Sequence, residues 1–300
     1  MSTRSRPRSE VAAYPEHLRT QVEAYLAGLR FATEPAAAGL EEAMRYSLLA
    51  GGKRIRPVLA LATAEALGHE QEDVMALAAA IELIHTYSLI HDDLPAMDDD
   101  ELRRGKPTCH VVYGEDVAIL AGDGLFAEAI KLVLDEQDGD PGRVLRALRH
   151  LVAAISVSGM VGGQYVDVKE TAPHDEAGLR QLHALKTGRL IAAAIECPLL
   201  LFGAGEAATM GLRRFAAELG VLFQIVDDIL DVTGDEAALG KPQGSDERHG
   251  KRTYVSVFGL DRARELARDS HSNARAALAD AGGQTATLEQ ITDYILTRDT

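Results

Sequence analysis

Acidic residues crowd together directly after the apolar stretch Ile81–Ile90. Six carboxylates fall within ten residues: Asp92, Asp93, Asp98, Asp99, Asp100 and Glu101. A solvated surface run is the alternative explanation of such a cluster. It fits poorly here, because negative charge at the C-terminal end of a helix opposes the helix dipole and is unfavourable unless cations neutralise it. Pro95 ends a regular helix near Leu94, and the residues that follow let Asp98 fold back towards Asp92. The cluster predicts a cation site.

A second cluster contains Asp227, Asp228 and Asp231, directly after the apolar segment Val221–Val226. The spacing places Asp227 and Asp231 on one face of a helix that we expect to be buried. Buried like charges repel and are costly without a partner. Oxygen ligands without a Cys or His framework indicate Mg²⁺, which keeps waters and takes substrate phosphate oxygens as further ligands.

Cations occur at intervals between and after these clusters. Gly51–Pro57 carries three of them in a glycine-containing loop before a helix, where an anion could bind, although an exposed basic turn is the alternative. Arg103 and Arg104 follow the first cluster, either as its salt-bridge partners or as phosphate ligands. The remaining candidates are Lys186, before a helix kink at Gly188, and Lys241 and Lys251 in the segment Gly234–Thr253.

No nucleophile accompanies these charges. A Ser-His-Asp set, a Cys-His set and a nucleotide-binding fingerprint are all missing from the sequence. His85 and His91 lie six residues apart and do not share a helix face, and His85 taken alone is typical of a core histidine. A site that binds metal and phosphate without a nucleophile indicates that phosphate is the leaving group.

Composition excludes several other classes of protein. The net charge is −15, which argues against a general nucleic-acid binder. Cys109 and Cys197, the two cysteines of the chain, predict two buried thiols in a reduced, cytoplasmic protein. The sequence has no apolar run of about 20 residues, so we predict no membrane span. Residues 1–12 are expected to form a disordered tail without a secretory signal.

The elements that position these side chains read as helices from Tyr14 onward. Apolar residues recur at helical spacing in ten segments: Leu18–Phe31, Leu40–Leu49, Val58–Leu67, Val74–Ile90, Val117–Leu134, Val144–Val157, Leu179–Leu201, Leu212–Val232, Leu260–Leu278 and Leu288–Leu296. Glycines and Pro95 separate them, Gly162-Gly163 among the expected breakers. No alternating strand pattern intervenes. We therefore predict one all-α domain spanning residues 13–300.

In this order the motifs resemble those of the trans-isoprenyl diphosphate synthases. Leu89–Asp100 is similar to the first aspartate-rich motif of that family, in the form with two extra residues, and Phe223–Asp231 is similar to the second. The other motifs follow in the family's order: Gly51–Pro57, Arg103–Gly105, Lys186-Thr187, Gly240-Lys241 and Gly250-Lys251. The resemblance extends from Tyr14 to the C-terminus. It implies a bundle of about ten or more helices around a deep central cavity, and a homodimer.

The resemblance also implies a role for each candidate residue. Asp92, Asp98 and Asp227 would bind about three Mg²⁺ ions with an allylic diphosphate. Arg103, Lys186, Lys241 and Lys251 would contact that diphosphate, and Thr187 and Gln224 would face the allylic cation formed when it leaves. The second substrate, isopentenyl diphosphate, would be held by Lys53, Arg56, His85 and Arg104.

Product length depends on how far the cavity extends along the first aspartate helix. Tyr87 lies five residues before Asp92, about 7 to 8 Å away at 1.5 Å per residue. Tyr87 and the adjacent Ser88 are the predicted chain-length residues, because a ring that pointed inward would stop growth after about three isoprene units. This interpretation favours a farnesyl (fifteen-carbon) over a geranylgeranyl (twenty-carbon) product. Simple core packing of Tyr87 is the alternative.

Three rival functions remain at this point. A terpene cyclase shares the first motif but needs neither the Gly51–Pro57 cations nor a second aspartate motif. A metal phosphohydrolase of the His-Asp type is suggested by His91-Asp92, without evident further histidine ligands. A non-catalytic synthase subunit typically lacks one aspartate motif, and this chain has both.

Overall fold

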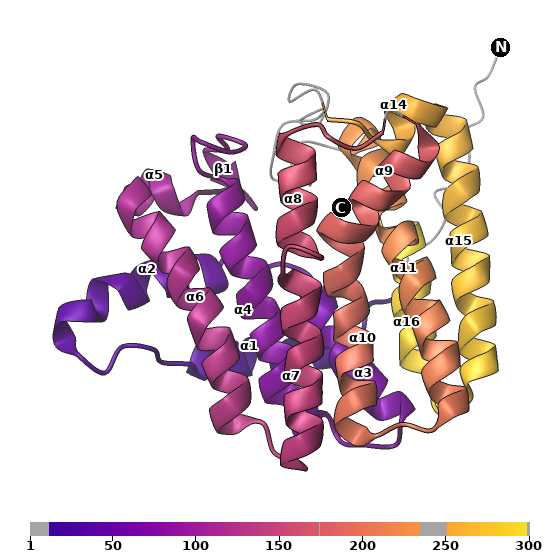
Figure 1. Cartoon of the computed structure of the whole chain (residues 1–300), viewed down its shortest axis with the longest axis horizontal. Helices are drawn as coiled ribbons and strands as arrows, with labels where there is room; N and C mark the ends of the chain where they lie inside the picture. The colour runs from indigo at the N-terminus through magenta and orange to yellow at the C-terminus, as the bar shows by residue number, and fades with distance from the viewer. Residues whose placement is uncertain (1–11, 174, 235–250, 299–300) are drawn as a thin grey trace.

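Helix follows helix along the chain, as the apolar periodicity predicts (Figure 1). The computed structural model describes residues 12–173, 175–234 and 251–298. Its helical elements are α1 (Glu16–Gly28), η1 (Pro35–Ala37), α2 (Ala38–Leu48), α3 (Ile55–Ala66), η2 (Gln71–Val74), α4 (Met75–Asp92), α5 (Cys109–Tyr113), α6 (Glu115–Glu136), α7 (Pro141–Ile155), α8 (Met160–Val168), α9 (Glu176–His183), η3 (Ala184–Gly188), α10 (Arg189–Phe202), α11 (Glu206–Thr233), α14 (Tyr254–Phe258), α15 (Leu260–Ala281) and α16 (Ala286–Thr297). The all-α prediction is confirmed.

The helices enclose one continuous apolar core, to which residues from Tyr14 to Ile295 contribute. Helix α4 is apolar on nearly every face and is buried along most of its length, so it lies inside the bundle as expected. Figure 1 shows α6 toward the left of the bundle, α7 and α10 near its middle, and α15 at its right edge. Cys109 and Cys197 are both buried free thiols, as predicted.

One short hairpin interrupts the helices in the described residues. Strands β1 (Leu102–Arg103) and β2 (Lys106–Pro107) pair antiparallel, with Arg103 opposite Lys106. The two turn residues, Arg104 and Gly105, both have positive φ, as a tight two-residue hairpin turn requires. Strands of two residues are too short to leave an alternating pattern in a sequence. The turn fixes where the two arginines project.

Gly162-Gly163 was expected to end a helix, and this prediction is wrong. Both glycines lie inside α8 and are buried. A Cβ at position 163 would come within 2.4 Å of the Lys186 backbone nitrogen, so glycine is required for close packing of α8 against η3. At the place of the kink predicted at Gly188, the helix has a π-helical turn, η3, which joins α9 to α10.

Two helical stretches are long and apolar enough, by composition alone, to cross a membrane. They are Gln71–Asp92 and Pro141–Val168, and 72% and 44% of their most apolar windows are buried in the fold. Core helices pass the same test, which accounts for the first stretch. The predicted absence of a membrane span stays a prediction.

The predicted tail lies mostly outside the described residues. Of residues 1–12 the structure describes Ala12, whose N–H donates to Thr297 Oγ1 at 2.9 Å.

Close packing of α11 against the end of α15 supplies a test of the fold. A Cβ on Gly211 would lie 2.5 Å from Ala281 Cα, a backbone atom with little freedom to move. We expect Gly211→Ala to destabilise the fold by about 1–3 kcal/mol, which lowers Tm by roughly 2–12 °C in thermal unfolding followed by circular dichroism. Gly39→Ala is the matched control, because Gly39 is also helical and has open space around it. An unchanged Tm for Gly211→Ala would contradict this packing.

Candidate active site

A polar cavity of about 350 Å³ opens where α4, α11 and the segment before α14 meet. Carboxylates from both predicted clusters line it: Asp92, Asp98 and Asp100 from the first, and Asp227, Asp228 and Asp231 from the second. Five other predicted site residues line the same cavity: the cations Arg103, Lys186 and Lys251, and the polar Thr187 and Gln224. Segments that are more than 100 residues apart in sequence therefore form one site, as predicted.

The first cluster folds back on itself after α4 ends at Asp92. The Asp98 N–H donates to the Asp92 carbonyl at 2.9 Å, which brings the two side chains to the same cavity, as predicted. Burial, reinforced by the negative charge of Asp98 and opposed by Lys186, raises the pKa of Asp92 to about 6. The site therefore concentrates negative charge that further positive charge would stabilise.

Cations of the protein already pair with several of these carboxylates. Lys251 Nζ lies 2.8 Å from Asp98 Oδ2, and Arg298 pairs with Asp227. Arg103 donates its Nε to both oxygens of Asp93, at 2.7 and 2.9 Å. Arg103 thus forms a salt bridge with the acidic cluster and also lines the cavity.

The donor set fits a divalent ion that is shared with a ligand. Within the described residues, no three His, Cys, Asp or Glu side chains converge closely enough to hold a metal ion by themselves. The carboxylates instead face one cavity from α11, from the end of α4 and from the loop that follows α4. Mg²⁺ commonly takes one or two carboxylates and completes its shell with water and phosphate oxygens. The arrangement suits an ion bound together with a diphosphate.

A second, mostly apolar cavity of about 630 Å³ adjoins the first. Leu89, Asp92, Lys186 and Thr187 line both cavities, so the polar site opens directly onto the apolar one. Tyr87 and Ser88 line the apolar cavity, together with side chains of α8 such as Met160 and Val161.

Tyr87 is almost buried, with 8% of its surface exposed, and it is fixed by ring contacts. Its ring packs edge-on against Phe126 and His91, with centroid distances of 5.2 and 5.8 Å. Burial raises its pKa to about 12, so the phenol is neutral at physiological pH. The Ser88 hydroxyl donates to the His85 carbonyl at 2.8 Å.

A chain of hydrogen bonds orients the two polar side chains at the junction of the cavities. The Thr187 hydroxyl donates to Gln224 Oε1 (2.9 Å), and Gln224 Nε2 donates to Asp228 Oδ1 (2.7 Å). The other Asp228 oxygen accepts the Tyr254 N–H at 2.6 Å. Since the Thr187 proton is engaged, its oxygen lone pairs are left to face the cavities.

Positive charge gathers beside the apolar cavity, around Arg56 and His85, which both line it. Burial lowers the pKa of Arg56, with Arg104 and Arg298 adding repulsion, and burial with the nearby arginines lowers that of His85. The guanidiniums of Arg56 and Arg298 lie 5.7 and 4.7 Å from the Phe223 ring centroid. The Nε atoms of both arginines are buried without a hydrogen-bond partner in the described part of the chain. Such a cluster is suited to an anion.

Some predicted residues lie beside the two cavities rather than in them. Lys53 Nζ lies 5.5 Å from the Tyr294 ring centroid, and Arg104 donates to the Gly51 carbonyl. Neither lines either cavity. Lys241 lies outside the described residues.

Sequence reasoning missed four site residues. Arg298 pairs with Asp227 from the end of the chain, and Asp167 accepts from Lys186 Nζ at 2.6 Å. Glu23 and Glu82 bind Arg54 under the Gly51–Pro57 loop. Asp167 and Glu82 could have been found from the sequence, because each is a charged residue in an otherwise apolar helix, but no spacing connects Arg298 to its partner.

His91 binds the Ile119 carbonyl at 3.0 Å, and no His-Asp metal set is present among the described residues.

Comparisons with known proteins agree with this geometry. The family model described as polyprenyl synthetase matches residues 37–295. Farnesyl diphosphate synthase of Escherichia coli is 46% identical over 266 residues, which cover 86% of this chain and 89% of that protein. A chloroplastic geranylgeranyl pyrophosphate synthase of Capsicum annuum is also 46% identical, over 87% of this chain and 72% of that protein.

Solved structures are similar over nearly the whole chain. A geranyltransferase of Helicobacter pylori, complexed with magnesium and isoprenyl diphosphate, superimposes with a TM-score of 0.83 at 32% identity, covering 97% of this chain and 98% of that one. A synthase of Zymomonas mobilis described as FPP/GFPP gives 0.82 at 35% identity, covering 94% and 96%. The family model, the relatives and the shared fold show that the chain is a trans-prenyltransferase. The chain belongs to the polyprenyl synthetase family, and within it to the short-chain trans-prenyltransferases.

Proposed function

We propose that this prenyltransferase condenses isopentenyl diphosphate with dimethylallyl and then geranyl diphosphate, and releases farnesyl diphosphate. The observation that carries the product assignment is the Tyr87 ring in the wall of the apolar cavity. Relatives of nearly equal identity are named for farnesyl and geranylgeranyl products, so geranylgeranyl diphosphate is the alternative product.

The allylic diphosphate is proposed to bind in the polar cavity. Arg103, Lys186 and Lys251 would bind its oxygens, and Asp92, Asp98 and Asp227 would hold Mg²⁺, about three ions per site. Bound Mg²⁺ supplies positive charge where negative charge develops on the leaving diphosphate. Lys251 and Arg298 already neutralise two of these carboxylates, and we propose that Lys251 exchanges Asp98 for an oxygen of the allylic diphosphate and that Arg298 exchanges Asp227 for an oxygen of isopentenyl diphosphate.

The hydrocarbon is proposed to extend from the shared residues into the apolar cavity. As the carbon–oxygen bond breaks, the oxygens of Thr187 and Gln224 present negative dipoles to the allylic cation. Asp228 keeps the Gln224 amide in the orientation that leaves Thr187 lone pairs for this purpose. The apolar walls exclude water, which would otherwise hydrolyse the cation.

Isopentenyl diphosphate is proposed to bind at the Arg56 and His85 cluster, with Lys53, Arg104 and Arg298 around it. The partnerless buried Nε of Arg56 supports an anion there. The double bond of isopentenyl diphosphate would attack the allylic cation, forming one carbon–carbon bond. A proton then leaves, to an oxygen of the departing diphosphate, and gives an allylic product five carbons longer.

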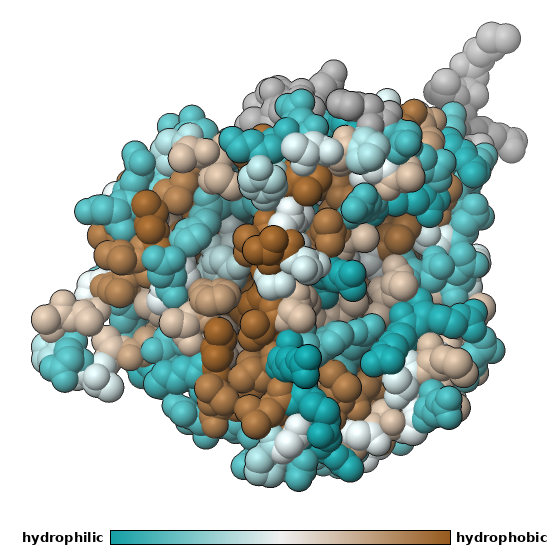
Figure 2. All heavy atoms as spheres, in the orientation of Figure 1, coloured by the Kyte–Doolittle hydropathy of each residue, from teal (hydrophilic) through white to brown (hydrophobic). Residues whose placement is uncertain are grey.

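Three further proposals concern the whole chain. We propose that residues 13–300 form one domain and that the enzyme is a cytoplasmic homodimer. Exposed apolar side chains of α6 and α7 that line neither cavity support a protein partner: Leu120, Leu134, Leu145 and Val152, together with Val157 in the turn between α7 and α8. Figure 2 shows apolar atoms gathered on this face. Sedimentation at equilibrium tests the dimer.

The reaction is tested by incubating the enzyme and Mg²⁺ with geranyl diphosphate, with and without isopentenyl diphosphate. A synthase forms a longer diphosphate only when isopentenyl diphosphate is present. A product formed from geranyl diphosphate alone would instead indicate a cyclase. No product in either reaction would favour a non-catalytic subunit.

A further inference from the structure

Arg54 stands between two cations proposed to bind isopentenyl diphosphate, yet it is buried rather than offered to a ligand. Its residue surface is 2% exposed, and its side chain is fully covered. Its guanidinium donates Nη1 to Glu82 (2.6 Å), Nε to Glu23 (2.8 Å) and Nη2 to the Leu48 carbonyl (2.6 Å). A guanidinium that is committed to three partners inside the protein is not a diphosphate ligand.

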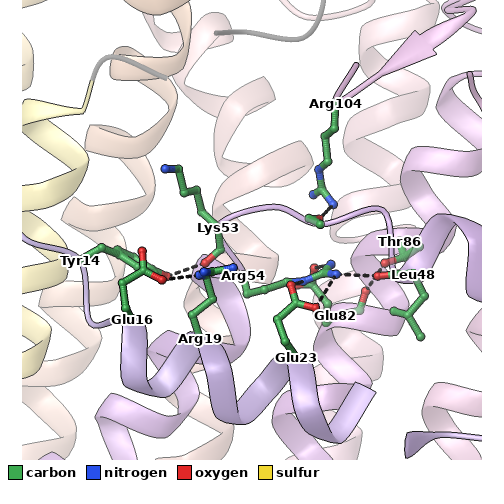
Figure 3. A network of polar contacts seen from close by, with 11 residues as sticks. Tyr14, Glu16, Arg19, Glu23, Leu48, Lys53, Arg54, Glu82, Thr86 and Arg104 are labelled. Atoms are coloured by element: carbon green, nitrogen blue, oxygen red, sulfur yellow. Dashed lines mark hydrogen bonds and ion pairs between the residues drawn. The ribbon is translucent and has the colours of Figure 1, made fainter. Parts of the chain in front are cut away.

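The three partners come from three different helices. Glu23 lies on α1, Leu48 ends α2, and Glu82 lies on α4, three residues before His85. Figure 3 shows the Arg54 guanidinium between Glu23 and Glu82, with the Lys53 side chain extending away from it. The ion pairs therefore fix the loop relative to the helix that carries His85 and Asp92.

The backbone of Arg54 gives independent support. Its φ of 54° and ψ of 37° are left-handed, a conformation that a residue with a Cβ adopts at an energetic cost. Arg54 is also the N-cap residue, directly before α3 begins at Ile55. The left-handed turn lets successive side chains leave the loop in different directions, inward for Arg54 and outward for Lys53. The buried ion pairs hold the backbone in this unfavourable conformation.

Other contacts hold the loop on the remaining sides. The Tyr14 hydroxyl donates to the Lys53 carbonyl at 2.7 Å, and Arg104 donates to the Gly51 carbonyl. The loop is thus preorganised before any substrate binds, which lowers the entropy lost on binding. Only the outward side chains remain for a ligand.

We propose that Arg54, through Glu82 and Glu23, is a positioning residue that aims Lys53 and Arg56 at the diphosphate of isopentenyl diphosphate. The inference rests on the proposed binding of that substrate by Lys53 and Arg56. It assigns the buried ion pairs to one of the two substrates: their loss weakens isopentenyl diphosphate binding and leaves allylic diphosphate binding intact.

The test removes both buried charges together, because Arg54→Met alone would leave the Glu82 carboxylate buried without its partner. In Arg54→Met/Glu82→Met we expect KM for isopentenyl diphosphate to rise by about tenfold or more, while KM for geranyl diphosphate and kcat change by less than about threefold. Arg54→Lys keeps the charge but cannot span three partners, so its KM for isopentenyl diphosphate should also rise. Thermal unfolding confirms that each variant is folded.

Two controls separate the outcomes. Arg275→Met/Glu289→Met removes another Arg–Glu pair (2.8 Å), between α15 and α16, and should leave both KM values unchanged. Lys53→Met tests the underlying assignment. If Lys53→Met raises KM for isopentenyl diphosphate and the folded Arg54/Glu82 variant does not, the positioning role is wrong. Equal rises for both substrates would also overturn it. No effect of Lys53→Met would overturn the assignment of Lys53 and the inference with it.

Discussion

Replacing Asp92 with asparagine is expected to lower kcat by about 10²–10³-fold at saturating Mg²⁺ and substrates. Asp92 lines both cavities, at the point where the leaving diphosphate and the growing chain are proposed to meet. Asparagine keeps its shape but not its charge, and a neutral amide is a poor partner for Mg²⁺. Initial rates of diphosphate release measure the effect.

The same substitution should not damage the fold. Burial disfavours the charge of Asp92, so removing that charge does not cost the ligand-free protein an important interaction. We expect the Tm of Asp92→Asn to equal or exceed that of the unmodified chain. Asp261→Asn is the matched control, since Asp261 lies on α15 with its side chain 99% exposed, and it should keep full activity. An Asp92→Asn variant with more than about a tenth of the original kcat would refute the metal-binding role.

Replacing Tyr87 with alanine is expected to lengthen the product. The ring lies in the wall of the apolar cavity and packs against Phe126, so its removal extends the space available to the chain. Discrimination against an added hydrocarbon unit by a wall of this kind is worth roughly tenfold or more, and the ratio of twenty- to fifteen-carbon product should rise by at least about that factor. Reversed-phase chromatography of the dephosphorylated products measures the ratio.

Tyr25→Ala provides the control for this experiment. Tyr25 is an aromatic residue of α1 that lines neither of the two cavities, so its removal should leave the product distribution unchanged. If Tyr87→Ala also leaves the distribution unchanged, Tyr87 is core packing, and the limit on product length lies elsewhere.

Local patterns predicted the helices and both acidic clusters well, because each depends on residues close in sequence. Asp98 folds back through a hydrogen bond to Asp92, which is only six residues earlier in the sequence. Asp227 and Asp231 share a face because the helix period requires it. Gly162 and Gly163 show the limit of such patterns. Glycine serves as a helix breaker or as a point of close packing, and only the position of Lys186 across the interface distinguishes the two.

Pairings between distant segments could not be predicted in the same way. Arg54 lies among residues that resemble an anion-binding loop, but its partners Glu23 and Glu82 are 31 and 28 residues away. Arg298 reaches Asp227 across 71 residues. Neither pairing follows from spacing, because each depends on how helices that are distant in sequence pack together. The charged residues of the sequence indicated a site for metal and phosphate. Which of those residues can contact a substrate depends on how the helices pack.

The most direct test of the proposed function is product analysis with isopentenyl diphosphate and geranyl diphosphate in the presence of Mg²⁺. A farnesyl diphosphate synthase gives the fifteen-carbon diphosphate as the main product, even when isopentenyl diphosphate is in excess, and gives none when chelator removes the metal. A predominantly twenty-carbon diphosphate would contradict the proposal that Tyr87 limits the product to fifteen carbons. A product formed without isopentenyl diphosphate would contradict the condensation itself.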